Sequence, residues 1–184
     1  RKGGVNIAGA TSSSFTITGA VVGDAGNYDV VVTGTCGTVT SNIATLTVNT
    51  GAAITTQPVS QTICAGTNVT FSVVATGTGI SFQWRKGGLN IGGATSSSFT
   101  ITGAAAGDAG NYDVVISAGC GNVTSNIATL TVNAITVINT QPASQTVCTG
   151  NNVTFTVIAA GTALTYQWRK SGVNIGGAVS SSFT

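Results

Sequence analysis

The stretch Asp108-Ala109-Gly110-Asn111-Tyr112-Asp113-Val114-Val115-Ile116 joins a glycine-containing turn to a run of alternating side chains. Tyr112, Val114 and Ile116 share one face of that run, because side chains in a β-strand point to opposite faces in turn. Val and Thr, which favour half-buried strands, are frequent along the whole chain. The stretch therefore predicts a β-strand that turns its aromatic and aliphatic side chains toward a core.

The chain repeats itself at a fixed spacing. Asp24-Ala25-Gly26-Asn27-Tyr28 matches the start of the stretch above, at an offset of 108 − 24 = 84 residues. A second motif, Arg-Lys followed by Gly or Ser, Gly, Val or Leu, Asn and Ile, begins at Arg1, Arg85 and Arg169 with the same offset. Such self-similarity indicates an array of like units, each long enough for one small domain.

The repeat predicts three parts of the chain. We expect the C-terminal part of one repeat at residues 1–50, a complete repeat at 51–134 and the N-terminal part of a third at 135–184. This is the pattern of a segment cut from a longer array. The alternative is a true subunit whose two half-repeats complete each other head to tail.

Short runs with strand character alternate with Gly-rich turns, and no segment keeps a 3.6-residue period. In the complete repeat, the expected strands are 54–63, 68–76, 80–86, 98–103, 110–118 and 122–133. Pro58 interrupts the first strand, which is tolerated at the edge of a sheet. Many short strands predict an all-β sandwich, and a new repeat starting near Ala134 predicts sandwiches stacked end to end.

The composition limits the possible partners. Charged residues make up 5% of the chain, against about 25% in an average soluble protein. The six basic residues form three Arg-Lys pairs rather than a stripe, so no nucleic-acid partner is expected. No run of 18 or more apolar residues occurs, so no membrane insertion is expected. The lack of His and Met and the few sites for trypsin-like proteases favour an extracellular or cell-surface location.

These motifs resemble the immunoglobulin superfamily, most closely an intermediate-set domain. The run 108–112 resembles the family's Asp-x-Gly-x-Tyr signature, and Trp84 and Trp168, each in Gln-Trp-Arg-Lys, resemble its core tryptophan. The resemblance implies tandem immunoglobulin-like β-sandwiches with both tryptophans in the core. It also implies that the hydroxyls of Tyr28 and Tyr112 bond to the backbone near the preceding turn.

The sequence departs from the family at one pair of core positions. Where the family often has a disulfide beside the tryptophan, this chain has Val73 and Val114. Burying each valine contributes about 1.5–3 kcal/mol, so the core should not depend on redox state. The Thr-, Ser- and Gly-rich sequence with few charges is similar to tandem repeats of very long bacterial surface and secreted proteins, many of which are adhesins or fibres.

The four cysteines recur at two positions in the repeat. Cys64 and Cys148 precede the turn between the first two strands, whereas Cys36 and Cys120 lie in the turn between the last two. These turns are at opposite ends of a sandwich, about 30 Å apart for a nine-residue strand, and a disulfide needs Cα atoms within about 7 Å. We therefore expect disulfides between adjacent repeats, favoured outside the cell. Free thiols or bonds to a neighbouring chain are the alternatives.

Little in the sequence points to catalysis or to a metal. The chain has no His to activate Ser97 or Ser98. The acidic residues also recur with the repeat: Asp24, Asp29, Asp108 and Asp113. We expect Asp108 to bond to its turn and Asp113 to form a cross-strand ion pair with Arg85. Two separated Asp per repeat do not form a calcium cage, and Cys without His is no zinc signature. We expect no enzyme, cofactor or metal site.

The leading interpretation is a structural repeat of an extracellular fibre, filament or adhesin shaft. Its partners would be neighbouring repeats of the same chain and neighbouring copies in a filament. The alternative is a carbohydrate- or protein-binding immunoglobulin-like adhesion module, whose loops would contact a cell-surface or polysaccharide ligand. The turns 34–38 and 118–122 stay similar between repeats, which favours the structural interpretation.

Overall fold

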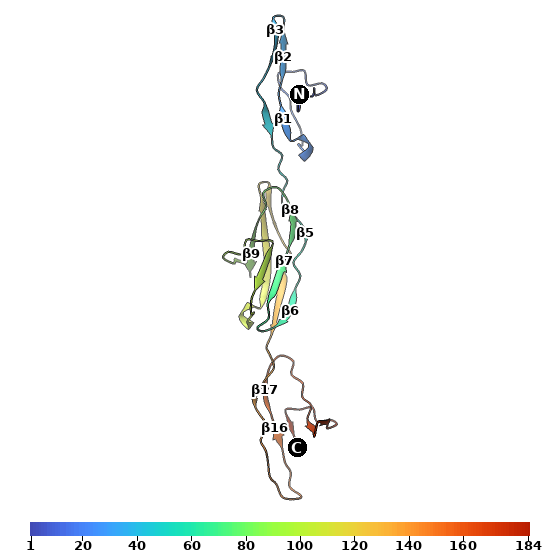
Figure 1. Ribbon diagram of the computed structural model, residues 1–184, viewed down its shortest axis with the longest axis vertical. Helices are drawn as coiled ribbons and strands as arrows, with labels where there is room; N and C mark the ends of the chain where they lie inside the picture. Colours follow the sequence, from blue (N-terminus) through green and yellow to red (C-terminus); the bar gives the residue numbers. More distant parts are fainter.

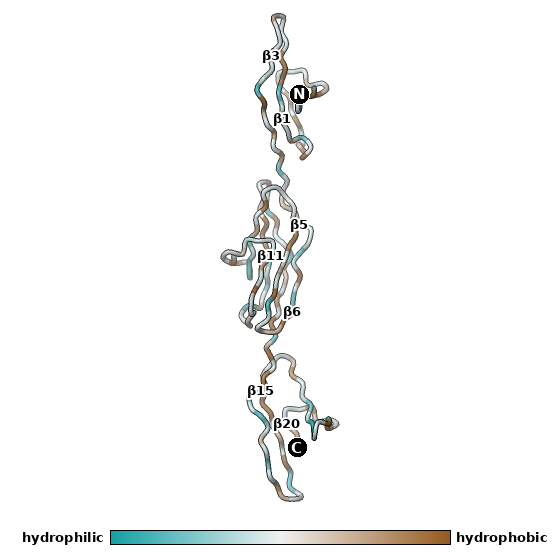
Figure 2. Tube along the Cα trace, viewed as in Figure 1, coloured by the Kyte–Doolittle hydropathy of each residue, from teal (hydrophilic) through white to brown (hydrophobic).

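The computed structural model describes residues 1–184 as three bodies of β-structure arranged end to end in an elongated rod (Figure 1). The central body is the most complete and contains almost all of the buried residues. Polar and apolar residues are mixed along the strands of all three bodies (Figure 2). This mixing is what strands with one face toward a core and one toward water require.

The first layer of the central body contains short antiparallel strand pairs. Strand β5 pairs with β8, and β7 pairs with β11. Their bounds are β5 Ala53–Thr56, β7 Val69–Ser72, β8 Val74–Thr76 and β11 Ser98–Ile101. The run expected as one strand at 68–76 is thus interrupted at Val73, and its two halves pair with different neighbours.

The second layer is a six-stranded sheet with the order β10-β9-β12-β14-β6, in which β13 also pairs with β12. All pairs are antiparallel except β14–β6, which is parallel. The bounds are β6 Gln61–Cys64, β9 Ser81–Lys86, β10 Leu89–Asn90, β12 Gly110–Ala118, β13 Gly121–Thr124 and β14 Ala128–Asn133.

The first expected strand, 54–63, crosses from one layer to the other at a proline. Its first half is β5 in the first sheet and its second half is β6 in the second. Between them, Pro58 is buried and has no N–H to leave unpaired. The side-chain oxygen of Gln57 accepts a hydrogen bond from the backbone N–H of Asn126 at 2.9 Å. This bond holds the segment between β5 and β6 against the segment between β13 and β14.

Two further details differ from the sequence-based expectation. The run 122–133 is two strands, because the buried Ser125 interrupts it. The Ser125 hydroxyl accepts the N–H of Val114 at 3.0 Å, and the Ser125 N–H donates to the Val114 carbonyl at 2.9 Å. The short strand β10 was not expected; Gly87 and Gly88, at φ +55° and +81°, form the tight turn that folds it back on β9.

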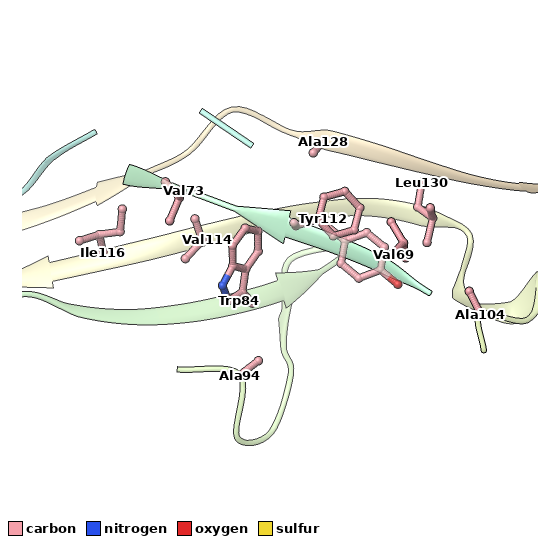
Figure 3. Close-up of a cluster of buried hydrophobic side chains, with 11 residues drawn as sticks. Val69, Val73, Trp84, Ala94, Ala104, Tyr112, Val114, Ile116, Ala128 and Leu130 are labelled. Carbon is pink, nitrogen blue, oxygen red and sulfur yellow. The ribbon is translucent and has the colours of Figure 1, made fainter. Parts of the chain in front are cut away.

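The core of the central body lies between the two layers and is aromatic at its centre (Figure 3). Trp84, Val114 and Ile116 are fully buried, and Phe71 stacks on Tyr112 with ring centroids 5.0 Å apart. The eleven residues of the cluster are Val69, Phe71, Val73, Trp84, Ala94, Ala104, Tyr112, Val114, Ile116, Ala128 and Leu130. Val73 and Val114 thus lie in the interior near Trp84.

The outer bodies contain fewer elements. Residues 1–50 hold η1 Val22–Asp24, β1 Gly26–Tyr28, β2 Val31–Gly34, β3 Gly37–Thr40 and β4 Ala44–Leu46. Residues 135–184 hold β15 Val137–Thr140, β16 Phe155–Thr156, β17 Ile158–Ala160, β18 Arg169–Lys170, β19 Val173–Asn174 and β20 Ser182–Phe183. Each outer body repeats pairings of the central one; for example, β16–β20 corresponds to β7–β11.

Candidate functional site: the junctions between repeats

The junction between the first and central bodies is held by a threonine clamp. The backbone N–H of Thr50 donates to the Thr78 hydroxyl oxygen at 3.0 Å. The backbone N–H of Thr78 donates in return to the Thr50 carbonyl at 3.2 Å, and the two hydroxyls lie 3.0 Å apart. Thr78 lies in the turn between β8 and β9, so a loop of the central sandwich fixes the segment that enters it.

The junction between the central and third bodies has the same clamp, 84 residues later. The Ala134 N–H donates to the Thr162 hydroxyl at 2.8 Å, and the Thr162 N–H donates to the Ala134 carbonyl at 3.4 Å. Only the hydroxyl–hydroxyl contact is missing, because alanine replaces Thr50 at this position. Since both backbone bonds recur, the clamp is a property of the repeat.

The clamp leaves no free residue between the central and third bodies. Asn133 is the last residue of β14 and lies opposite Cys64 in the parallel β14–β6 ladder. The next residue, Ala134, is already bonded to Thr162 of the third body. A connection without a flexible spacer restricts the angles that neighbouring bodies can adopt.

Glycines allow the close approach of the two segments. Gly77 has φ +144°, and a Cβ placed on it would lie 2.9 Å from the Gly51 carbonyl oxygen and 2.7 Å from Ile80. Its counterpart Gly161 has φ +151°, and a Cβ there would lie 3.1 Å from the Cα of Thr136. Any larger residue at these positions would force the clamp apart and strain the backbone.

The cysteines all lie near such ends and are all free and exposed. Cys120, in the turn between β12 and β13, donates its thiol to the Asn49 carbonyl at 3.5 Å, at the first junction. Cys64 lies at the other end of the central body, opposite Asn133. Cys36 and Cys148 occupy the corresponding positions of the outer bodies. The structure therefore separates Cys64 from Cys120 within one sandwich.

The charged residues bind strands β9 and β12 together. Arg85 donates from Nε and Nη2 to the two carboxylate oxygens of Asp113, at 2.8 and 2.7 Å, and these residues are direct cross-strand partners. Hydrogen bonding to Asp113 raises the pKa of the Arg85 guanidinium above its usual value. Arg1 and Asp29 repeat the pair at 2.9 and 2.7 Å, and the hydrogen bond from Arg1 lowers the pKa of the Asp29 carboxyl.

The remaining acidic residues cap the turn before the tyrosine. Asp108 accepts the Ala105 N–H on its side chain at 2.8 Å, and its carbonyl accepts the Tyr112 hydroxyl at 2.7 Å. Asp24 and Tyr28 form the same corner in the first body, with the hydroxyl 2.6 Å from the carbonyl. Every carboxylate side chain in the molecule is thus engaged in contacts within its own repeat.

The predicted core residues differ in burial between the bodies. Trp84, Tyr112, Val73 and Val114 are buried in the central sandwich. Tyr28 and Trp168 are half-buried, since each lacks the strands that cover its central counterpart.

Sequence reasoning missed the clamp threonines. The pairs Gly77-Thr78 and Gly161-Thr162 recur at the 84-residue spacing, which was the available signal. In the sequence they are indistinguishable from ordinary turn residues. Their role follows only from the segment that folds back against them.

Two further structural features concern metal binding and membrane insertion. No group of three or more His, Cys, Asp or Glu side chains gathers in a position to hold a metal ion. The structure also contains no helix with the length and apolar character needed to span a bilayer.

Comparison with known sequences gives one family. Residues 52–132 match the family model of the immunoglobulin I-set domain. This range covers the central sandwich, from β5 to β14. No curated protein sequence matches the chain.

The arrangement of the bodies is similar to solved tandem arrays. An I-band fragment of titin matches with a TM-score of 0.70 at 18% identity, over 85% of this chain and 59% of the fragment. Immunoglobulin domains 1–5 of Sidekick-1 match with a TM-score of 0.55 at 21% identity, over 84% of this chain and 37% of that one. The chain thus spans less than two thirds of either structure, and identities this low show the fold alone.

The expected fold class is confirmed: the protein is all-β and consists of immunoglobulin-like sandwiches in tandem. Such an arrangement is consistent with a structural or adhesion module. The resemblance to an intermediate-set domain is also confirmed for the central sandwich.

Proposed function

We propose that this chain is a stretch of a stiff shaft, built from immunoglobulin-like repeats, in an extracellular fibre, filament or surface adhesin. The observation that carries the proposal is the repeated clamp, in which Thr78 and Thr162 hold the connecting backbone at both junctions. A protein whose repeats preserve the geometry of their connections is suited to holding its ends at a set distance.

The contacts made by the loops at the first junction support a structural role rather than ligand binding. In an adhesion module, the turns at the end of a sandwich would be free to contact a ligand. Here the β8–β9 turn is hydrogen-bonded to Thr50, and Cys120 in the β12–β13 turn is hydrogen-bonded to Asn49. Both turns are therefore occupied by hydrogen bonds to the preceding body. This favours the shaft over a carbohydrate- or protein-binding module.

The composition supports the proposed location and the proposed association between copies. Ten charged residues in 184, six basic and four acidic, leave little electrostatic repulsion between neighbouring copies. The low charge, the lack of His and Met, and the few basic residues open to trypsin-like proteases support an extracellular or cell-surface location and lateral association into filaments.

Stiffness can be measured with equivalent surface positions in the three bodies. Val5, Leu89 and Val173 are 71%, 77% and 70% exposed and stand one repeat apart. In a background with the native cysteines changed to serine, spin labels on V5C and L89C measure the distance across the first junction. Labels on L89C and V173C read the second. Pulsed EPR should give one narrow distance for each pair, and the two distances should be nearly equal.

The threonines supply matched controls. Thr78→Ala should broaden only the distance across the first junction, and Thr162→Ala only the distance across the second. Broad distributions that neither variant changes would refute the stiff shaft. Binding of the unmodified chain to a glycan array would instead favour the adhesion module.

A further inference from the structure

Two cysteines of the central repeat lie beside equivalent asparagines at the two junctions. The thiol of Cys120 lies 3.5 Å from the carbonyl oxygen of Asn49, a residue that belongs to the preceding body. Gly119 is also close, since a Cβ on it would lie 3.7 Å from the Asn49 side chain. The β12–β13 turn of one repeat thus reaches back to the last residues of the repeat before it.

The counterpart of Asn49 in the central body is Asn133, since 133 − 49 = 84. Asn133 is the register partner of Cys64 in the parallel β14–β6 ladder, and its carbonyl accepts the Ala65 N–H at 2.8 Å. Neighbouring strands lie about 4.8 Å apart, so Cys64 is adjacent to Asn133. In successive complete repeats, one cysteine of each repeat therefore flanks the same asparagine.

The two junctions share the same backbone hydrogen bonds and the same glycine conformation. The clamps at Thr50–Thr78 and Ala134–Thr162 use the same backbone atoms, and Gly77 and Gly161 have nearly the same φ. The approach of Cys120 to the first junction therefore describes the approach of its copy to the second, where Cys64 lies.

We propose that Cys64 of each repeat forms a disulfide with the Cys120-type cysteine of the next, so that the shaft is covalently joined at every junction. The inference rests on the proposed shaft. A low-molecular-weight disulfide such as oxidised glutathione accepts two electrons and the two thiol protons and leaves as two thiols, while one Sγ–Sγ bond forms. The strand spacing of about 4.8 Å places Cys64 next to Asn133. The 3.5 Å contact of the Cys120 thiol with the Asn49 carbonyl places the incoming cysteine next to the equivalent asparagine. A disulfide needs Cα atoms within about 7 Å, which two cysteines beside one residue can meet.

Within residues 1–184 the counterparts do not meet. Residues 1–50 contain no copy of β6, and residues 135–184 contain no copy of the β12–β13 turn. The four cysteines are accordingly free and exposed. A junction with both cysteines requires the third repeat to be completed.

The test extends the full chain at its C-terminus with a second copy of residues 101–134, which completes the third repeat. This adds one cysteine, the copy of Cys120, to the four of the chain, making 4 + 1 = 5. After incubation with reduced and oxidised glutathione, alkylation and mass measurement should show two of the five thiols lost. Peptide mapping should find Cys64 linked to the added cysteine, and reduction should restore both thiols.

Substitutions separate this pair from the others. Cys64→Ser should leave all remaining thiols free, whereas Cys36→Ser and Cys148→Ser should leave the cross-link intact. Five alkylatable thiols, or chains linked to one another on a non-reducing gel, would overturn the proposal. The EPR distances at Val5 and Leu89 are measured without any native cysteine. A stiff shaft can therefore be confirmed even if the disulfide is not found.

Discussion

Trp84 and Trp168 have the same neighbours in sequence but different surroundings in space. Each indole N–H donates at 2.9 Å to the carbonyl of the serine twelve residues later, Ser96 or Ser180. Yet Trp84 is fully buried, whereas Trp168 is half-buried. Strand β12 brings Val114 against Trp84, and residues 135–184 contain no copy of that strand.

The first body shows the complementary half of the same comparison. The corner between Tyr28 and Asp24 forms as it does between Tyr112 and Asp108. Tyr112 is covered by Phe71, but Tyr28 instead borders a hollow of about 480 Å³. Local hydrogen bonds thus follow from local sequence, whereas burial depends on strands far away in the chain.

Removing the central indole should reduce the stability of the central sandwich more than any other change proposed below. Trp84→Ala should lower the free energy of unfolding of the central sandwich by about 3–5 kcal/mol, because it leaves a cavity in a packed core. Trp168→Ala should leave that value almost unchanged, because Trp168 lies in a different body. Hydrogen exchange of the β12 amides in increasing denaturant measures the central body alone. Equal losses for the two variants would show that the bodies unfold as one unit.

A disulfide introduced into the core should form in the central body and not between the outer bodies. With the native cysteines changed to serine, Val73→Cys combined with Val114→Cys should oxidise and stabilise the central body by about 2–4 kcal/mol. The matched pair, Val157→Cys with Val30→Cys, should stay reduced within one chain, because those residues lie in different bodies. Thiol counting and thermal unfolding check both, and an unoxidised central pair would contradict the core arrangement.

The tyrosine corner should contribute a smaller, pH-dependent amount. Tyr112→Phe removes the hydrogen bond to the Asp108 carbonyl and should cost about 0.5–1.5 kcal/mol at neutral pH. Burial, and secondarily the Asp108 charge, raises the pKa of Tyr112. The folded state therefore holds the phenol proton more tightly than the unfolded state, whose pKa is about 10. Stability should fall as pH rises from about 10 through the raised value.

The phenylalanine variant isolates that effect. The alkaline loss attributed to Tyr112 should be absent in Tyr112→Phe when unfolding is titrated between neutral and alkaline pH. Tyr28→Phe should leave the neutral-pH stability of the central body unchanged. An identical alkaline profile for the wild type and Tyr112→Phe would assign the loss to other groups.

The smallest effect should come from the ion pair. Arg85→Ala removes two hydrogen bonds to Asp113 at a partly exposed position and should cost about 0.2–1 kcal/mol, with less effect at high salt. Arg169→Ala should have no measurable effect, since Arg169 forms no ion pair. Denaturant unfolding at low and high ionic strength separates the two. A salt-independent cost for Arg85→Ala would indicate lost packing rather than lost charge.

Much of the central fold could be predicted from the sequence because its signals are local. The alternation of Tyr112, Val114 and Ile116 predicted both the strand at 110–118 and the inward face that the structure shows. The interruption at Ser125 could not be predicted, because it depends on a hydrogen bond to Val114 from a neighbouring strand. The same holds for the candidate site, since Thr78 acts on Thr50, 28 residues earlier.

The period of the array, the strand character and the inward face of the strand at 110–118 could be read from the amino-acid sequence, because these features depend on residues one or two positions apart and on an 84-residue copy. Which copies are buried, and how one body is held to the next, became known from the three-dimensional arrangement. Burial and clamping require two segments to meet in space, and the free energy of that contact is not encoded in either segment alone.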